Sequence, residues 1–173
     1  MTIESDAAYR PCVGIMVMNT AGLVWIGRRP DAPDEPDEPE GPGTWWQMPQ
    51  GGIDPDEDPR LAALRELREE TGLYSVAFVA EHPEWLRYDL PPSLIGKAWG
   101  GRWRGQRQKW FLVRLTGPDS EVNLIPPAGH QIEFSTWRWA QLSELPGLIV
   151  PFKRDVYSAV ISAFAPMVRP ASV

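Results

Sequence analysis

Apolar runs of two kinds divide the chain into short strands and two helices. Runs rich in β-branched and aromatic residues predict strands. These strands are expected at residues 12–19, 23–29, 44–53, 74–82, 109–117 and 133–141. Two other segments, residues 59–71 and 151–168, repeat apolar residues at helical spacing. The order of elements predicts an α/β fold in which a mixed β-sheet is packed between helices.

The first helix has clear signals at both ends. Asp58 suits the N-cap, Pro59 suits the first helical position, and Gly72 suits the C-terminal stop. At about 100° per residue, one side of this helix carries three leucines. They are Leu61, Leu64 and Leu67. We expect this side to bind the helix to the core.

Charge is spread unevenly along the chain. The 173 residues suit one domain, 1–173, with a Pro- and acid-rich loop at about residues 31–43. Residues 31–40 hold six acids and no bases, so the net charge of −6 leaves zero on the remainder. Residues 97–109 hold five bases and no acids. The net negative charge of the whole chain therefore does not argue against a polyanionic partner.

Several classes of protein are disfavoured by composition. No run of about 18 apolar residues is present, so no membrane span is expected, and the N-terminus has no apolar signal-peptide core. The single cysteine, Cys12, excludes an internal disulfide and lies in an apolar run, which predicts a core residue rather than a nucleophile. His82 and His130 alone do not favour a histidine-rich zinc site. These features favour a reducing, cytoplasmic setting.

Three glutamates crowd the side of the first helix opposite to the leucines. Glu66, Glu69 and Glu70 are expected to face outwards together. A solvated charged face is the ordinary explanation, but like charges at this spacing cost roughly 0.2–0.5 kcal/mol per pair. A divalent cation such as Mg²⁺ takes oxygen ligands and shares its shell with substrate phosphates. Gly51 and Gly52, just before the helix, permit close backbone approach to such a site.

Residues 51–73 read GGIDPDEDPRLAALRELREETGL. This stretch resembles the Nudix box, in which Gly, five residues, Glu and seven residues precede Arg-Glu-apolar-any-Glu-Glu-any-Gly-apolar. All nine fixed positions match: Gly51, Glu57, Arg65, Glu66, Leu67, Glu69, Glu70, Gly72 and Leu73. The resemblance implies the Nudix fold with a loop-helix-loop catalytic motif. It also implies hydrolysis of a nucleoside diphosphate linked to another group, with two or more Mg²⁺ or Mn²⁺ ions when substrate is bound.

Segments outside the box resemble one branch of that family, from Tyr9 to about Tyr157. They include YRPCVGIMVMN, WWQMPQGGID, EWLRYDLP, GQRQKWFL, EFSTWRW and PFKRDVY. This branch contains the bacterial RNA pyrophosphohydrolases and the related dinucleoside polyphosphate (Ap4A) hydrolases. The resemblance implies conversion of 5′-triphosphate RNA ends to 5′-monophosphate with release of pyrophosphate. The alternative is hydrolysis of Ap4A to ATP and AMP. The longer acidic loop, next to Arg28 and Arg29, is the main departure.

The resemblance also implies residue roles. The expected metal ligands are the helix glutamates Glu66, Glu69 and Glu70, with Glu133 and the Gly51 carbonyl. Glu69 and Glu133 are both candidate bases, and Glu57 would pair with Arg65 to brace the motif. Substrate contacts are expected from Arg10, Arg28, Arg29, Tyr88, Lys109, Phe152 and Lys153.

Ordinary structural roles compete with these assignments. Arg10 could make a surface salt bridge, Tyr88 and Phe152 could be core, and Glu133 could face solvent on its predicted strand.

A non-catalytic RNA- or nucleotide-binding module would need no complete set of glutamates. A nucleotide-pool enzyme acting on damaged triphosphates fits the flanking segments less well.

Overall fold

The computed structural model describes residues 6–30 and 45–171. The predicted acidic loop at residues 31–43 lies outside the described residues. The boundaries of a single domain, which include that loop, therefore stay a prediction.

One mixed sheet contains all the strands of the described residues. They are β1 (Tyr9–Met18), β2 (Val24–Arg28), β3 (Trp46–Gln47), β4 (Gln50–Gly52), β5 (Val76–Glu81), β6 (Leu86–Asp89), β7 (Gly105–Leu115) and β8 (Thr136–Ala140). The order is β3-β2-β1-β7-β5, with β4 on β1, β6 on β7 and β8 on β2. The central β1–β7 pair is parallel along its whole length, and the other pairs are antiparallel. The sheet is mixed, as predicted.

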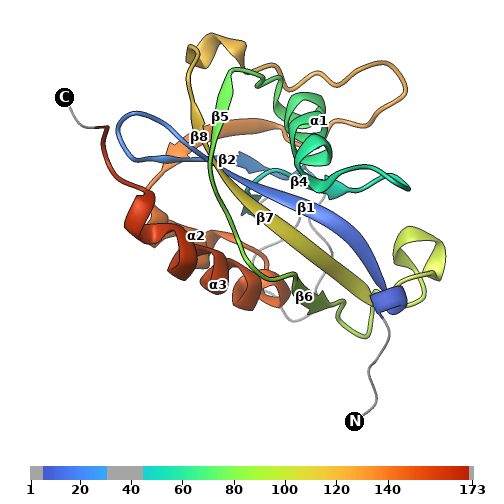
Figure 1. Ribbon diagram of the computed structural model, residues 1–173. Helices are drawn as coiled ribbons and strands as arrows, with labels where there is room; N and C mark the ends of the chain where they lie inside the picture. The colour runs from blue at the N-terminus through green and yellow to red at the C-terminus, as the bar shows by residue number, and fades with distance from the viewer. Residues whose placement is uncertain (1–5, 31–44, 172–173) are drawn as a thin grey trace.

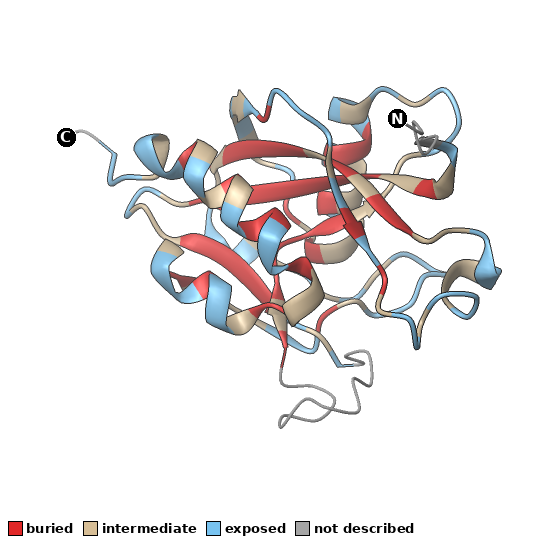
Figure 2. Cartoon of the chain, turned by 90° about the horizontal axis from the view of Figure 1, so that it is seen from below, coloured by how far each residue is buried: buried red, intermediate tan, exposed pale blue. Residues whose placement is uncertain are grey.

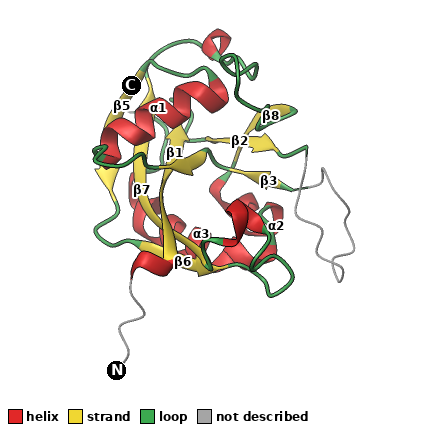
Figure 3. Ribbon diagram, turned by 90° about the vertical axis from the view of Figure 1, so that its right-hand side faces the viewer, coloured by secondary structure: helices red, strands yellow, loops and turns green. Residues whose placement is uncertain are grey.

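Helices cover both faces of this sheet. They are α1 (Pro59–Thr71), α2 (Leu145–Leu148) and α3 (Arg154–Phe164). In Figures 1 and 3, α1 lies on one face, and α2 and α3 lie on the other. Strand β1 serves both layers, because Ile15 and Val17 pack towards α1 whereas Met16 and Met18 pack towards α3. Figure 2 shows the buried positions gathered on the central strands and on the inner sides of the helices. The predicted α/β fold is confirmed.

The ends of α1 match the sequence signals. The Asp58 carboxylate accepts hydrogen bonds from the backbone N–H groups of Arg60 (2.8 Å) and Leu61 (3.4 Å). Gly72 ends the helix in the left-handed conformation, with φ of 80°, and its N–H donates to the Arg68 carbonyl. The box therefore starts and stops its helix through local interactions.

The predicted orientation of α1 is wrong. Leu61 is 62% exposed and Leu64 is 36% exposed, and of the three leucines Leu67 alone is buried. The side that packs on the sheet is built instead around the small residues Ala62 and Ala63. Small side chains let the helix approach β1 and β4 closely. As a result, the glutamates are carried towards the sheet rather than away from it.

Other boundaries also differ from the prediction. The segment 44–53 divides into β3 and β4 around Pro49, and β6 was not predicted. The C-terminal α-helix spans only Arg154–Phe164, with 3₁₀ turns at Pro151–Lys153 and Ala165–Met167. The prolines in these turns lack the N–H that a continuous helix needs. Among the described residues, no helix has the length and apolar character needed to cross a membrane.

Candidate active site

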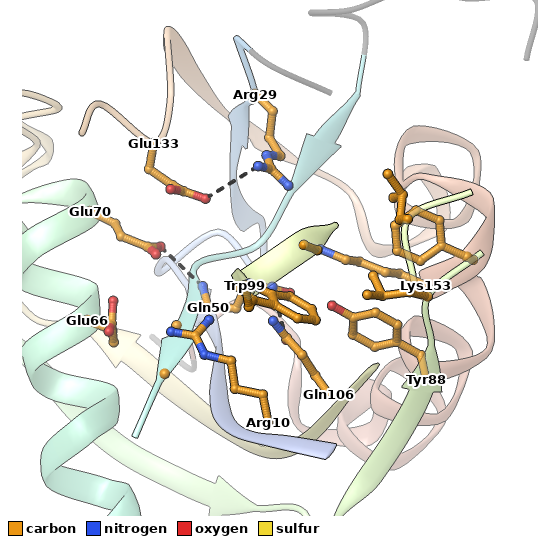
Figure 4. A pocket seen from close by; sticks show the side chains of 16 residues that line it. Arg10, Arg29, Gln50, Glu66, Glu70, Tyr88, Trp99, Gln106, Glu133 and Lys153 are labelled. Atoms are coloured by element: carbon orange, nitrogen blue, oxygen red, sulfur yellow. Dashed lines mark hydrogen bonds and ion pairs between the residues drawn. The ribbon is translucent and has the colours of Figure 1, made fainter. Parts of the chain in front are cut away.

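A pocket of about 510 Å³ opens where α1, β4, β6 and β7 meet. Figure 4 shows that its two ends differ in chemistry. The end near α1 carries Glu66, Glu70 and Glu133, and the opposite end carries Tyr88 and Lys153, with the Phe152 ring 5.6 Å from that of Tyr88. Trp99 lies between the two ends, next to Arg10. Arg10 and Arg29 lie on either side between these ends. The pocket can therefore accept a ligand with an anionic part and a flat, apolar part.

The acidic end combines one helix with one distant loop. Glu66 and Glu70 come from α1. Glu133 was predicted to lie on a strand, but it lies in the loop before β8. A smaller adjoining pocket of about 170 Å³ is lined by these three glutamates together with Glu69. All four predicted acidic residues therefore border one continuous region of the surface.

Burial and mutual repulsion disfavour negative charge at this end. Burial raises the pKa of Glu70 well above its usual value, and the nearby carboxylates of Glu133 and Glu66 raise it further. Burial also raises the pKa of Glu66, although Arg65 opposes the effect. The Glu70 carboxylate accepts a hydrogen bond of 3.2 Å from the Gln50 N–H. A cation placed here would offset this concentration of carboxylates.

The donor atoms suit Mg²⁺ or Mn²⁺, since hard divalent cations prefer carboxylate and carbonyl oxygens. Within residues 6–30 and 45–171, however, no three acidic, histidine or cysteine side chains converge in an arrangement that would hold an ion. Two of these carboxylates are instead held by Arg65, whose Nη1 lies 3.0 Å from Glu66 Oε1 and 3.3 Å from Glu69 Oε2. The carboxylates fit the ion in chemistry and must turn away from Arg65 to bind it.

Successive glycines on β4 make room on opposite faces of the strand. A Cβ added at Gly51 would lie 2.1 Å from the carboxyl carbon of Glu66. A Cβ added at Gly52 would lie 2.6 Å from Nη2 of Arg10. Because adjacent positions of a strand point to opposite faces, the Gly-Gly pair admits a carboxylate on one side and a guanidinium on the other.

Glu57 and Arg65 form the predicted brace. Arg65 Nη2 donates to Glu57 Oε1 (2.8 Å), and Arg65 Nε donates to Glu57 Oε2 (2.9 Å). Arg65 Nη2 also donates to the Gly52 carbonyl (2.9 Å). The hydrogen bonds from Arg65 lower the pKa of Glu57 to about 2, and those to Glu57 raise the pKa of Arg65. This bidentate pair ties the loop after β4 to α1.

The opposite end of the pocket joins aromatic rings to a buried amine. The rings of Tyr88 and Phe152 lie 5.6 Å apart, and Lys153 Nζ lies 5.5 Å from the Tyr88 ring. Lys153 Nζ donates to Gln47 Oε1 at 3.4 Å. Burial, and then the charge of Arg29, lower the pKa of Lys153 to about 7. Tyr88 is buried, as expected of a core residue, and it also lines the pocket.

Gln50 and Gln106 line the pocket, and the buried Gln108 holds both; sequence reasoning gave none of the three a role in the site. Gln108 Nε2 donates to Gln106 Oε1 (2.8 Å) and to Gln50 Oε1 (3.2 Å). Trp110 Nε1 donates to Gln108 Oε1 (2.9 Å), which fixes the orientation of that amide. The spacing of Gln106 and Gln108 places both on one face of a strand and was the available signal. Trp99 also lines the pocket, with the Arg10 guanidinium carbon 5.7 Å from its ring centre.

Two predicted substrate residues are not brought to this pocket. Lys109 follows Gln108 on β7 and so points to the other face, where it pairs with Glu81 (3.3 Å) and donates to the His82 carbonyl (2.6 Å). Arg28 is exposed at the end of β2 and does not line the pocket. Cys12 is fully buried, as predicted, and burial raises the pKa of its thiol to about 12.

Comparison with known proteins places this architecture in a family. Residues 8–160 match the NUDIX domain. A protein of Rhodopseudomonas palustris (strain HaA2) named RNA pyrophosphohydrolase is 54% identical over 165 residues, covering 95% of this chain and 96% of that protein. A Brucella ovis protein of the same name is 56% identical over 165 residues, covering 95% and 92%. The chain therefore belongs to the Nudix hydrolase family, whose members generally need divalent metal ions such as Mg²⁺.

Solved structures resemble this chain in fold. A C. elegans Ap4A hydrolase in a binary complex has a TM-score of 0.59 and 19% identity, covering 91% of this chain and 98% of that one. The E. coli dihydroneopterin triphosphate pyrophosphohydrolase has a TM-score of 0.59 and 16% identity, covering 90% and 99%. At these identities the likeness concerns the fold alone.

Proposed function

We propose that this protein removes pyrophosphate from the 5′-triphosphate end of RNA and leaves a 5′-monophosphate. The observation that carries the proposal is the division of one pocket into a carboxylate end and an aromatic end, with arginines between them. A 5′-terminal nucleotide has the matching order of polyphosphate followed by base. The relatives named RNA pyrophosphohydrolase, which align along nearly the whole chain, support the same substrate.

The carboxylate end would hold two or more divalent ions. The proposed ligands are Glu66, Glu69, Glu70, Glu133 and the Gly51 carbonyl. When bound, Mg²⁺ would neutralise negative charge on the polyphosphate and promote the ionisation of water. The Glu57–Arg65 pair contacts no substrate in this scheme and acts by positioning α1 against β4.

The arginines would hold the polyphosphate during hydrolysis. Arg29 lies 4.0 Å from Glu133, and its buried Nε has no hydrogen-bond partner within the part of the chain that the structure describes. A phosphate oxygen would satisfy this donor, and a second would meet Arg10 across the pocket. One water is consumed: its oxygen bonds to phosphorus, the phosphoanhydride bond between the α- and β-phosphates breaks, pyrophosphate leaves, and Glu69 or Glu133 accepts the proton of the water.

The aromatic end would receive the nucleotide. The rings of Tyr88 and Phe152 offer flat apolar surfaces, and the Lys153 amine offers a donor beside them. Trp99 lines the same pocket next to Arg10 and offers a further ring on which a base would stack. An adenine would also fit these groups, so Ap4A is the natural competing substrate.

Side-by-side turnover with Mg²⁺ tests the proposal. Purified protein is given triphosphorylated RNA or Ap4A, and the products are separated. Faster release of pyrophosphate from RNA, lost in Glu70→Gln and retained in the exposed control Glu84→Gln, is the expected result. Faster formation of ATP and AMP would assign the site to dinucleoside polyphosphates. Product from neither substrate, with Mg²⁺ or Mn²⁺, would refute both assignments and favour a binding module.

A further inference from the structure

A second pocket of about 540 Å³ lies beside the first, between the loop after β4 and the basic segment that precedes β7. We call it the arginine–tryptophan pocket, after Trp85, Arg102, Trp103 and Arg107 in its lining. Its other wall comes from Ile53 to Glu57, and Arg10 lines both pockets. The basic, tryptophan-containing segment of the sequence therefore builds a cavity that the proposed chemistry does not use.

The arginines of this pocket stack on its tryptophans. The Arg107 guanidinium carbon lies 4.5 Å from the centre of the Trp85 ring, and that of Arg102 lies 4.4 Å from the centre of the Trp103 ring. A stacked guanidinium keeps its N–H edge free to donate to phosphate. The tryptophan rings are also surfaces on which bases of a single strand can stack.

Arg107 is placed where an anion would be favourable. It lies opposite Arg87 in the β6–β7 register, so two guanidinium groups belong to this face of the sheet. Its Nε is shielded from solvent and has no hydrogen-bond partner among residues 6–30 and 45–171. A phosphate would satisfy this donor.

The acidic wall does not cancel this preference. Glu57 is held by Arg65 at 2.8 Å, and Asp54 lies 3.7 Å from the same guanidinium. Asp56 also lines this wall, so three acids face Arg10, Arg102 and Arg107, and Arg65 behind the wall adds a further positive charge. Ile53, Pro55 and Pro59 line the same pocket and add apolar surface to it.

The two pockets are neighbours, because consecutive residues line them and one side chain, that of Arg10, borders both. Gly52 lines the first pocket and Ile53 lines the second. Arg10 crosses between them, resting against Gly52 with its guanidinium over Trp99. A nucleic-acid strand whose 5′ end occupies the first pocket would meet Arg10 as it leaves.

We propose that the arginine–tryptophan pocket binds the nucleotides downstream of the 5′ end of the RNA substrate. Bases would stack on Trp85 and Trp103, and the phosphates between them would contact Arg102 and Arg107. The inference rests on the proposed function and adds to it a subsite that favours single-stranded RNA over a mononucleotide. A docking site for a protein partner is the competing use of the same surface.

Substrate length tests this subsite. Triphosphorylated RNAs of two and six nucleotides are compared, and the gain in kcat/KM from the shorter to the longer is measured. Each stacked base contributes about tenfold, so Trp85→Ala and Trp103→Ala should each reduce the gain by about that factor. Arg169→Gln, an exposed arginine away from both pockets, should keep the gain of the wild type. Circular dichroism of each variant verifies folding.

Salt dependence and crosslinking give independent readouts. For binding of 5′-monophosphate RNA, log K falls with log salt, and each lost phosphate contact should make this negative slope shallower by about 0.7. Arg102→Gln with Arg107→Gln should therefore make it shallower by about 1.4. RNA with 4-thiouridine at nucleotides three to five should crosslink to peptides containing Trp85 or Trp103.

The outcomes separate the two proposals. Absence of turnover of even the two-nucleotide RNA by the wild type would refute the proposed function. Turnover without a gain from length, or a gain and a salt slope that the variants leave unchanged, would overturn the subsite alone and favour a protein partner.

Discussion

Replacing Gly51 by alanine should separate activity from stability. The added Cβ would lie 2.1 Å from the carboxyl carbon of Glu66, whereas ordinary van der Waals contacts begin near 3.4 Å. The carboxyl carbon must therefore move by about 1.3 Å. Displacements of about 1 Å at a reacting centre can cost about 100-fold in rate. We expect kcat on triphosphorylated RNA to fall by about that factor.

Stability should change little, because the group that must move is the end of a flexible side chain. Overpacking against rigid atoms costs about 1–3 kcal/mol, but rotation of Glu66 relieves this contact, so the free energy of unfolding should stay within about 1 kcal/mol of the wild type. Gly147→Ala is the matched control, since a Cβ there has no neighbour within 4 Å among the described residues. It should leave kcat unchanged and keep the free energy of unfolding within about 1 kcal/mol of the wild type.

A double-mutant cycle would identify Glu66 as the group through which Gly51→Ala acts. Once Glu66→Gln has removed the charge, adding Gly51→Ala should slow the enzyme little further. Single-turnover rates of the four proteins give the coupling. Independent losses that multiply, or wild-type kcat in Gly51→Ala, would refute the steric argument.

Two further predictions concern charge and pH. Arg65 lowers the pKa of Glu57 to about 2. The stability that Glu57→Gln removes should therefore be present above about pH 4 and should vanish as pH falls towards 2. Urea titrations that give the same difference in free energy of unfolding between wild type and variant at about pH 2 and about pH 6 would contradict this. Because burial lowers the pKa of Lys153 to about 7, the unfolded chain binds more protons between about pH 7 and 10. Lys153→Met should therefore stabilise the fold more at pH 6 than at pH 10, and a pH-independent difference would count against a buried amine.

Local signals in the sequence predicted the helix of the box but not its orientation. The cap at Asp58, Pro59 and the stop at Gly72 act within a few residues, and all are present in the structure. Which side packs depends on the distant strand β4, whose glycines admit Glu66. Counting large leucines gave the wrong side, because the close contact needs small residues.

The pocket also depends on pairings that no local pattern reveals. Gln106 and Tyr88 become neighbours through the antiparallel β6–β7 pair, and Glu133 arrives on a loop far along the chain. The resemblance nevertheless named Glu66, Glu70, Glu133 and the arginines Arg10 and Arg29, all of which line one pocket. Lys109 was misplaced for a simple reason, since strand alternation with Gln108 sends it to the opposite face.

The most direct test of the account is the rate of Mg²⁺-dependent pyrophosphate release from triphosphorylated RNA by Glu70→Gln. Glutamine keeps the shape of Glu70 and an oxygen for the Gln50 N–H, so the fold should persist. We predict a loss of at least about 100-fold, with wild-type rates in Glu84→Gln. A rate for Glu70→Gln within a few-fold of the wild type would contradict the claim that the α1 carboxylates perform the hydrolysis.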